Sequence, residues 1–130
     1  SQMIRLDEYV ARRHSLAYRY NEMLADLPVT LPWRHPDTYS SLHLYIIRLR
    51  LEDINSNHRK VFESMQALGI GVNLHYMPVY HHPYYQKLGF ELEKLPEAER
   101  YYADAISLPL FPLLTEIQQD QVVDALKRSL

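Results

Sequence analysis

The chain is organised around the stretch Gly69-Ile70-Gly71-Val72-Asn73-Leu74-His75-Tyr76-Met77-Pro78-Val79-Tyr80-His81-His82-Pro83-Tyr84-Tyr85. This stretch holds three of the seven histidines and four of the eleven tyrosines. We expect Gly69 to end a helix, because glycine readily adopts the left-handed conformation found just after helices. Pro78 interrupts regular strand pairing, and Pro83 suits the first turn of a short helix. The pattern therefore predicts a helix end, a short strand, a turn and a second helix.

The predicted strand shows an alternation of apolar and polar side chains. Val72, Leu74 and Tyr76 are expected on one face, with Asn73 and His75 on the other, because successive side chains of a strand point to opposite faces. One face is then apolar, and the other carries an amide and an imidazole. The question is whether this stretch is a packed aromatic corner or part of a site.

Composition narrows the class of protein. A chain of 130 residues fits one domain with its own core, and a hydrophobic fraction of 47% is ordinary for a globular protein. A net charge of -2, with the basic residues spread along the chain, argues against nucleic-acid binding. There is no apolar run of membrane-spanning length, no signal-peptide pattern and no cysteine. We expect a cytoplasmic protein without membrane contact.

Periodicity in the rest of the chain predicts many helices and few strands. Apolar residues recur at helical spacing from Met3 to Leu24, which predicts the longest helix. The run His43–Leu49 is almost continuously apolar and predicts a central strand. The remaining predicted elements are a short strand within 27–33, helices beginning near 58, 83, 96 and 116, and a brief strand within 106–112. This order indicates an α+β fold, with helices packed on a small, mainly antiparallel sheet.

The closing helix has the clearest local signal. Thr115 is followed three residues later by Gln118, which is the pattern of a capping box. We expect this helix to face the core through its apolar positions, which are Ile117, Val122, Val123, Leu126 and Leu130.

Residue patterns of catalysis and metal binding are weak. His81 and His82 are adjacent, and His75 lies six residues away with no carboxylate or cysteine between, whereas zinc needs a converging set of ligands. No Gly-x-Ser-x-Gly elbow and no phosphate-binding glycine loop is present. A Schiff-base lysine needs a setting that activates its amine, and all four lysines lie in polar helical or loop contexts: Lys60, Lys87, Lys94 and Lys127.

Four motifs in order resemble a known family. They are Ser41-Leu42-His43-Leu44-Tyr45, Gly69 to Tyr80, Pro83-Tyr84-Tyr85, and Ser107-Leu108-Pro109-Leu110-Phe111-Pro112 with Thr115. Together they resemble the C-terminal domain of the DegT/DnrJ/EryC1/StrS sugar aminotransferases, which are fold-type I enzymes that depend on pyridoxal phosphate. The resemblance is strongest to members that act in pseudaminic acid biosynthesis. It covers nearly the whole chain.

The resemblance implies a domain organisation. Residues 1–130 would form the C-terminal small domain, with the first long helix over residues 1–25 joining it to a large domain that is absent here. The large domain of the family holds the pyridoxal phosphate and the Schiff-base lysine, so we expect no bound cofactor, no catalytic residue and no activity in this fragment alone. The parent would be a homodimer that transfers an amino group from glutamate to the C4 keto group of a UDP-linked deoxy keto-sugar.

The resemblance also implies site residues. His75 matches a histidine at the edge of the active site, and His75, Tyr76 and Asn73 would complete the substrate pocket. Tyr80 stands where the family commonly has histidine, so it receives no role. A backbone-bonded strand histidine remains the alternative for His75, and aromatic packing remains the alternative for Tyr76, Tyr84 and Tyr85.

The other aromatic and histidine residues are expected to be structural. We interpret His43 and Tyr45 as strand-core residues, and His81 and His82 as turn residues. If a large domain is missing, an apolar strip should be exposed along the first helix and beside His75. Two other functions stay open: a stand-alone, non-catalytic module that binds a ligand or partner, and a histidine-based metal protein.

Overall fold

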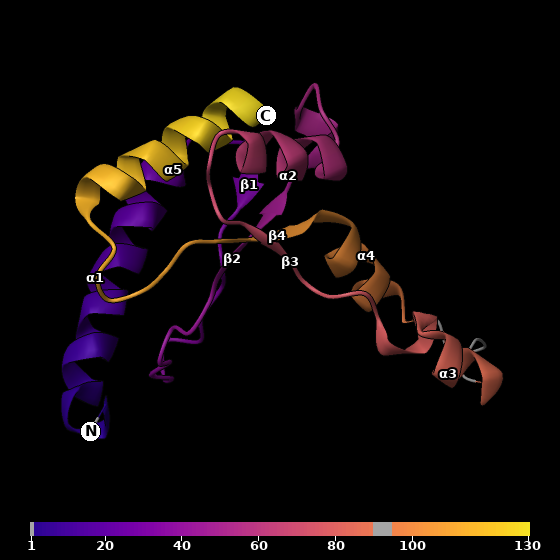
Figure 1. Cartoon of the computed structure of the whole chain (residues 1–130), viewed down its shortest axis with the longest axis horizontal. Coiled ribbons are helices and arrows are strands. Elements are labelled where there is room, and N and C mark those ends of the chain that lie inside the picture. The colour runs from indigo at the N-terminus through magenta and orange to yellow at the C-terminus, as the bar shows by residue number, and fades with distance from the viewer. Residues whose placement is uncertain (1, 90–94) are drawn as a thin grey trace.

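The computed structural model describes residues 2–89 and 95–130 (Figure 1). Its elements follow in the order η1 (Gln2–Arg5), α1 (Leu6–Leu24), β1 (Val29–Thr30), β2 (Tyr45–Leu49), η2 (Leu51–Asp53), α2 (His58–Ala67), β3 (Asn73–Leu74), η3 (Val79–His81), α3 (Pro83–Lys87), α4 (Pro96–Asp104), β4 (Ala105–Leu108) and α5 (Glu116–Ser129), where η marks a 3-10 helix. In the described part of the chain no helix is both long enough and apolar enough to cross a membrane.

The four strands form one antiparallel sheet. Its order is β1-β2-β4-β3, and each neighbouring pair is antiparallel. The strand predicted to be central, β2, pairs on both sides, whereas β3 lies at one edge. The predicted α+β fold with helices on a small antiparallel sheet is confirmed.

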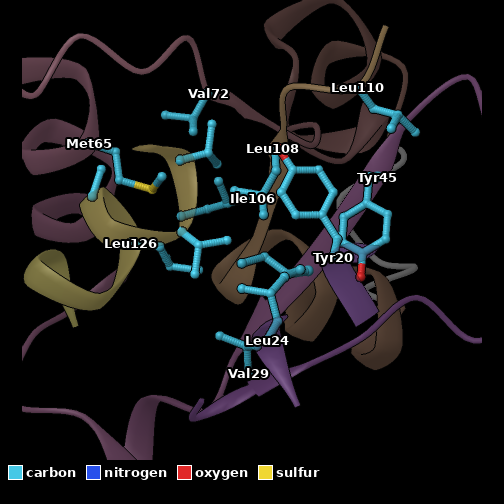
Figure 2. Close-up of a cluster of buried hydrophobic side chains, with 14 of the residues drawn as sticks. Tyr20, Leu24, Val29, Tyr45, Met65, Val72, Ile106, Leu108, Leu110 and Leu126 are labelled. Atoms are coloured by element: carbon cyan, nitrogen blue, oxygen red, sulfur yellow. The ribbon is translucent and has the colours of Figure 1, made fainter. Parts of the chain in front are cut away.

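The two faces of the sheet have different cover. On β2, Tyr45, Ile47 and Leu49 are buried and alternate with the half-buried Ile46 and Arg48. The buried side chains join a core with residues of α1, α2, β4 and α5 (Figure 2). In Figure 1, α1, α2 and α5 gather on one side of the sheet, and α4 and α3 extend away on the other. The sheet therefore has one well-covered face and one face with lighter cover.

Local sequence signals set several element ends. The Thr115 hydroxyl accepts from the Gln118 backbone N–H, and the Gln118 side chain accepts from the Thr115 N–H, so the predicted capping box is confirmed. The side chain of Asn57 caps α2 by accepting from the Lys60 N–H at 3.0 Å. Gly69 follows α2 with a φ of 81°, the left-handed conformation that its position after the helix predicts.

Several apolar positions are exposed rather than buried as the periodicity predicts. Ile117 of α5 is 71% exposed, and Met3 and Leu6, at the start of the first helical stretch, are also exposed. His43 precedes β2 and is exposed, so the prediction of a core position for His43 is wrong, whereas Tyr45 is buried as expected. Helical spacing shows which side of a helix is apolar, but not whether a neighbour covers each turn of it.

Candidate functional site

The candidate site begins at the edge strand β3. Asn73 pairs with Ser107 and Leu74 with Ile106, which fixes β3 against the buried strand β4. The Ser107 hydroxyl also donates to the Asn73 carbonyl at 3.4 Å. The Asn73 side chain is exposed. Since β3 ends at Leu74, the next residue leaves the ladder at the rim of the sheet.

His75 is buried one residue past this strand. Its side chain is the only one of the predicted site residues that is buried, with 5% of the residue exposed. Its Nε2 atom is buried and has no hydrogen-bond partner among the described residues. Burial lowers the pKa of His75, because desolvation disfavours the imidazolium. The described chain therefore presents a neutral imidazole whose inner nitrogen is unsatisfied.

Tyr76, the next residue, is 76% exposed. Its ring packs edge-on against His75, with ring centroids 4.7 Å apart. The predicted strand over residues 72–76 is thus too long, and the predicted faces are wrong beyond Leu74. Once the chain leaves the sheet, the strict alternation of a strand no longer applies, so the imidazole turns inward and the phenol turns outward.

An exposed apolar surface continues from Tyr76. Met77 and Val79 are also exposed, and Tyr84 of α3 is exposed on the same stretch of chain. Within this chain Tyr76 packs edge-on against His75 and Tyr84 packs edge-on against Tyr85, although most of Tyr76 and Tyr84 is exposed, so aromatic packing stays open as the alternative. A contiguous exposed apolar surface is typical of a face that another group covers.

Glu99 of α4 links the end of this stretch to the rest of the fold. The Tyr80 hydroxyl donates to Glu99 Oε1 at 2.7 Å, and His81 Nε2 lies 2.5 Å from the same oxygen. Burial raises the pKa of Tyr80, and the hydrogen bond to Glu99 raises it further. His81 is therefore more than a turn residue. No local pattern signals this cluster, because 18 residues separate His81 from Glu99.

Metal and lysine chemistry find little support in the described residues. No group of three or more His, Asp, Glu or Cys side chains that could hold a metal ion is found among residues 2–89 and 95–130. Lys60, Lys87 and Lys127 are exposed, and Lys94 lies outside the described residues. Pyridoxal phosphate needs a lysine amine for its covalent attachment. None of these three exposed lysines lies in a buried setting that would activate its amine.

A hollow of about 550 Å³ lies elsewhere in the fold, between α1 and the segment before β2. In it His14 stacks on Tyr39 with ring centroids 4.7 Å apart. Arg34 lies over the ring of Tyr18, 5.4 Å from its centroid, and Trp33 is exposed at the rim. This hollow could not be predicted from the sequence, because its walls come from segments that only the fold brings together.

Comparison with known proteins places the chain in a family. The model of the DegT/DnrJ/EryC1/StrS aminotransferase family matches residues 1–127. The chain belongs to this family. This DegT-family chain is 31% identical over 129 residues to the spore coat polysaccharide biosynthesis protein SpsC of Bacillus subtilis, with 97% of the chain and 33% of SpsC covered.

Solved aminotransferase structures share the fold of the DegT-family chain. Helicobacter pylori PseC, an aminotransferase involved in the biosynthesis of pseudoaminic acid, matches with a TM-score of 0.87 and 28% identity over 99% of this chain and 34% of PseC. DesV of S. venezuelae, solved in complex with a ketimine intermediate, matches with a TM-score of 0.85 and 32% identity over 97% of this chain and 33% of DesV. The chain spans about a third of the length of these relatives.

Proposed function

We propose that the chain is the C-terminal small domain of a pyridoxal-phosphate-dependent sugar aminotransferase. Residues 1–130 would form this domain, with α1 joining it to a large domain that holds the cofactor and its lysine. The family membership and the share of the relatives that the chain covers support this proposal. On this reading the chain alone binds no cofactor and has no activity.

The proposed substrate is a UDP-linked deoxy keto-sugar. Glutamate gives up its amino group and leaves as 2-oxoglutarate, and the C4 keto group of the sugar becomes an amine. A role in pseudaminic acid biosynthesis is the specific assignment that we propose, supported by the similarity to PseC. The active form would be a cytoplasmic homodimer, with the substrate site shared between subunits.

The observation that carries the proposal is the match of the family model to residues 1–127, in a chain that spans about a third of the curated relative SpsC. Within the described residues, the buried His75 lies against the exposed ring of Tyr76. These two residues would form part of one wall of the substrate pocket, which the large domain and its ligand complete.

The described residues would bind and orient rather than perform the chemistry. The imidazole of His75 would hold one hydrogen bond to the substrate or cofactor, so its part would be to bind and orient rather than to move the reaction's proton. Tyr76 offers an aromatic face for a sugar or a base, and the exposed amide of Asn73 offers a donor and an acceptor. Bound pyridoxal phosphate would supply the electron sink for amino transfer.

The test uses the complete protein that contains this chain. The variant His75→Ala is compared with the matched control His82→Ala, whose side chain is exposed at the start of α3. We expect kcat/KM for amino transfer from glutamate to the keto-sugar to fall about 10- to 100-fold for His75→Ala, because a hydrogen bond to a charged or reacting group contributes about 1.5–3 kcal/mol. Equal values of kcat/KM for both variants would show that His75 does not contribute to the substrate site.

A stand-alone binding module is the alternative, and it is separated by titration of the isolated chain. Pyridoxal phosphate is added to the 130-residue chain, and binding is followed by absorbance. The proposal expects no stoichiometric binding. A one-to-one complex with the isolated chain would show that the site is complete without a second domain.

A further inference from the structure

Residues 75–78, between β3 and η3, belong to no helix or strand, yet they carry His75 and Tyr76. Such a segment would be expected to vary in conformation unless both of its ends are held. Its first end is held by β3, where Leu74 pairs with Ile106 of β4. What holds its second end decides whether the imidazole and the phenol keep fixed positions.

Glu99 holds that second end. One carboxylate oxygen, Oε1, accepts from the Tyr80 hydroxyl at 2.7 Å and lies 2.5 Å from His81 Nε2. Both donors belong to η3, which begins directly after Pro78. Hydrogen bonds to an ionised carboxylate are about twice as strong as neutral ones. The side chains of His81 and Glu99 are each about one-third exposed, so the cluster is partly shielded from water.

The helix that carries Glu99 is itself fixed to the sheet. Asp104, the last residue of α4, forms a bidentate pair with Arg48 of β2, with N–O distances of 2.8 and 2.9 Å. The chain then enters β4 at Ala105, and β4 pairs with β3. The connections form a closed circuit: β3, residues 75–78, η3, Glu99, α4, β4 and again β3. Residues 75–78 are therefore held at both ends, by β3 and by η3, and both ends connect to the same sheet.

We propose that Glu99 is a positioning residue, which holds the segment of His75 and Tyr76 in a binding conformation through the Tyr80 hydroxyl and His81 Nε2. Glu99 does not need to touch the substrate for this. Glu99 acts through Tyr80 and His81, to which the sequence assigned no functional role. The expected effect of Glu99 on amino transfer rests on the proposed function, but its effect on the conformation of residues 75–78 does not.

The first test measures the segment itself in the 130-residue chain. Backbone amide hydrogen exchange over residues 76–82 is compared for the wild type, Glu99→Ala and the control Glu97→Ala, whose side chain is exposed on the same helix and pairs with Arg100. We expect exchange to accelerate about tenfold or more in Glu99→Ala alone. Unchanged exchange in Glu99→Ala would overturn the inference.

The second test measures catalysis in the complete protein. Glu99→Ala is expected to raise KM for the sugar and to lower kcat/KM about 10-fold at a temperature where the variant is fully folded, because small displacements of binding groups reduce rates steeply. Glu99→Gln keeps an oxygen that accepts both hydrogen bonds, so it should recover most of the loss. A fall in kcat with unchanged KM, not rescued by glutamine, would indicate a merely structural role.

The outcomes separate this inference from the proposed function. If exchange responds to Glu99→Ala but the complete protein transfers no amino group, the positioning role stands and the proposed function fails. If amino transfer occurs but neither exchange nor KM responds, the positioning role fails. Should Glu99→Ala not fold, Tyr80→Phe is used instead, because it removes one of the two hydrogen bonds. It is expected to change hydrogen exchange and KM in the same direction but less. No change in either would refute the positioning role of Glu99.

Discussion

The bidentate pair between Arg48 and Asp104 fastens α4 to the sheet, and breaking it should destabilise the fold measurably. The two N–O distances are 2.8 and 2.9 Å, and the side chains are 32% and 14% exposed. The hydrogen bond to Asp104 raises the pKa of Arg48, as an attractive partner should. None of the described residues of α4 is buried. Little apolar packing therefore substitutes for this pair.

The expected magnitude lies between two reference cases. Hydrogen bonds to charged groups contribute about 1.5–3 kcal/mol, whereas exposed surface pairs contribute about 0–1 kcal/mol. The partial exposure of Arg48 lowers the first value, and the bidentate geometry keeps the pair above the second. We expect Asp104→Ala to lower the free energy of unfolding by about 2 kcal/mol. Because the Arg48 side chain is only 32% exposed, removal of Asp104 leaves a partly desolvated guanidinium with the ring of Tyr101, 5.7 Å away, as a weaker partner.

The assay is a double-mutant cycle measured by urea unfolding. Arg48→Ala, Asp104→Ala and the double variant give a coupling free energy, which we expect to be about 1–2 kcal/mol. The control is a second cycle on Arg59 and Glu63, a pair on the surface of α2 with side chains 85% and 57% exposed. A coupling at Arg48 and Asp104 no larger than that of the control would refute the reasoning.

Two further predictions concern backbone conformation and pH. Gly69→Ala should lower the free energy of unfolding by about 1 kcal/mol, because Gly69 has a φ of 81°. Gly71→Ala should leave it nearly unchanged, and at neither position does an added Cβ meet an atom within 4 Å. Equal unfolding midpoints for the two variants would contradict this prediction. The pKa of His75 is lowered in the folded state. The unfolded chain therefore binds more protons than the folded chain as the pH falls below about 6.5, the ordinary pKa of histidine. The contribution of His75 to the free energy of unfolding should be full above that pH and should decrease as the pH falls further below it. His75→Gln should flatten this fall between pH 7.5 and 5.5, and an equally steep dependence in both proteins would argue against it.

The parts of the fold that the sequence predicted are those set by neighbouring residues. The capping box of Thr115 and Gln118, the cap at Asn57 and the left-handed Gly69 each depend on contacts within a few positions. The central strand β2 was also predictable, since an almost continuous apolar run suits a strand with neighbours on both sides.

What the sequence could not predict depends on contacts between distant segments. Alternation placed His75 and Tyr76 on the wrong faces, because nothing local shows that β3 ends at Leu74. The bonds from η3 to Glu99 span 18 and 19 residues and follow no spacing rule. For the site, the residue pattern indicated only a polar and aromatic patch, and the family resemblance was needed to assign roles. The exposure of Ile117 depends in the same way on which neighbour covers it.

We propose that this chain completes a pyridoxal-phosphate-dependent sugar aminotransferase, and amino transfer can be followed directly. The complete protein is supplied with pyridoxal phosphate, ¹⁵N-labelled glutamate and a UDP-linked 4-keto-sugar, and the label is followed by NMR. We expect ¹⁵N on C4 of the sugar, with one 2-oxoglutarate formed for each amino-sugar, and no transfer by the 130-residue chain alone. A complete protein that moves no label to the sugar, or an isolated chain that does, would overturn the proposal.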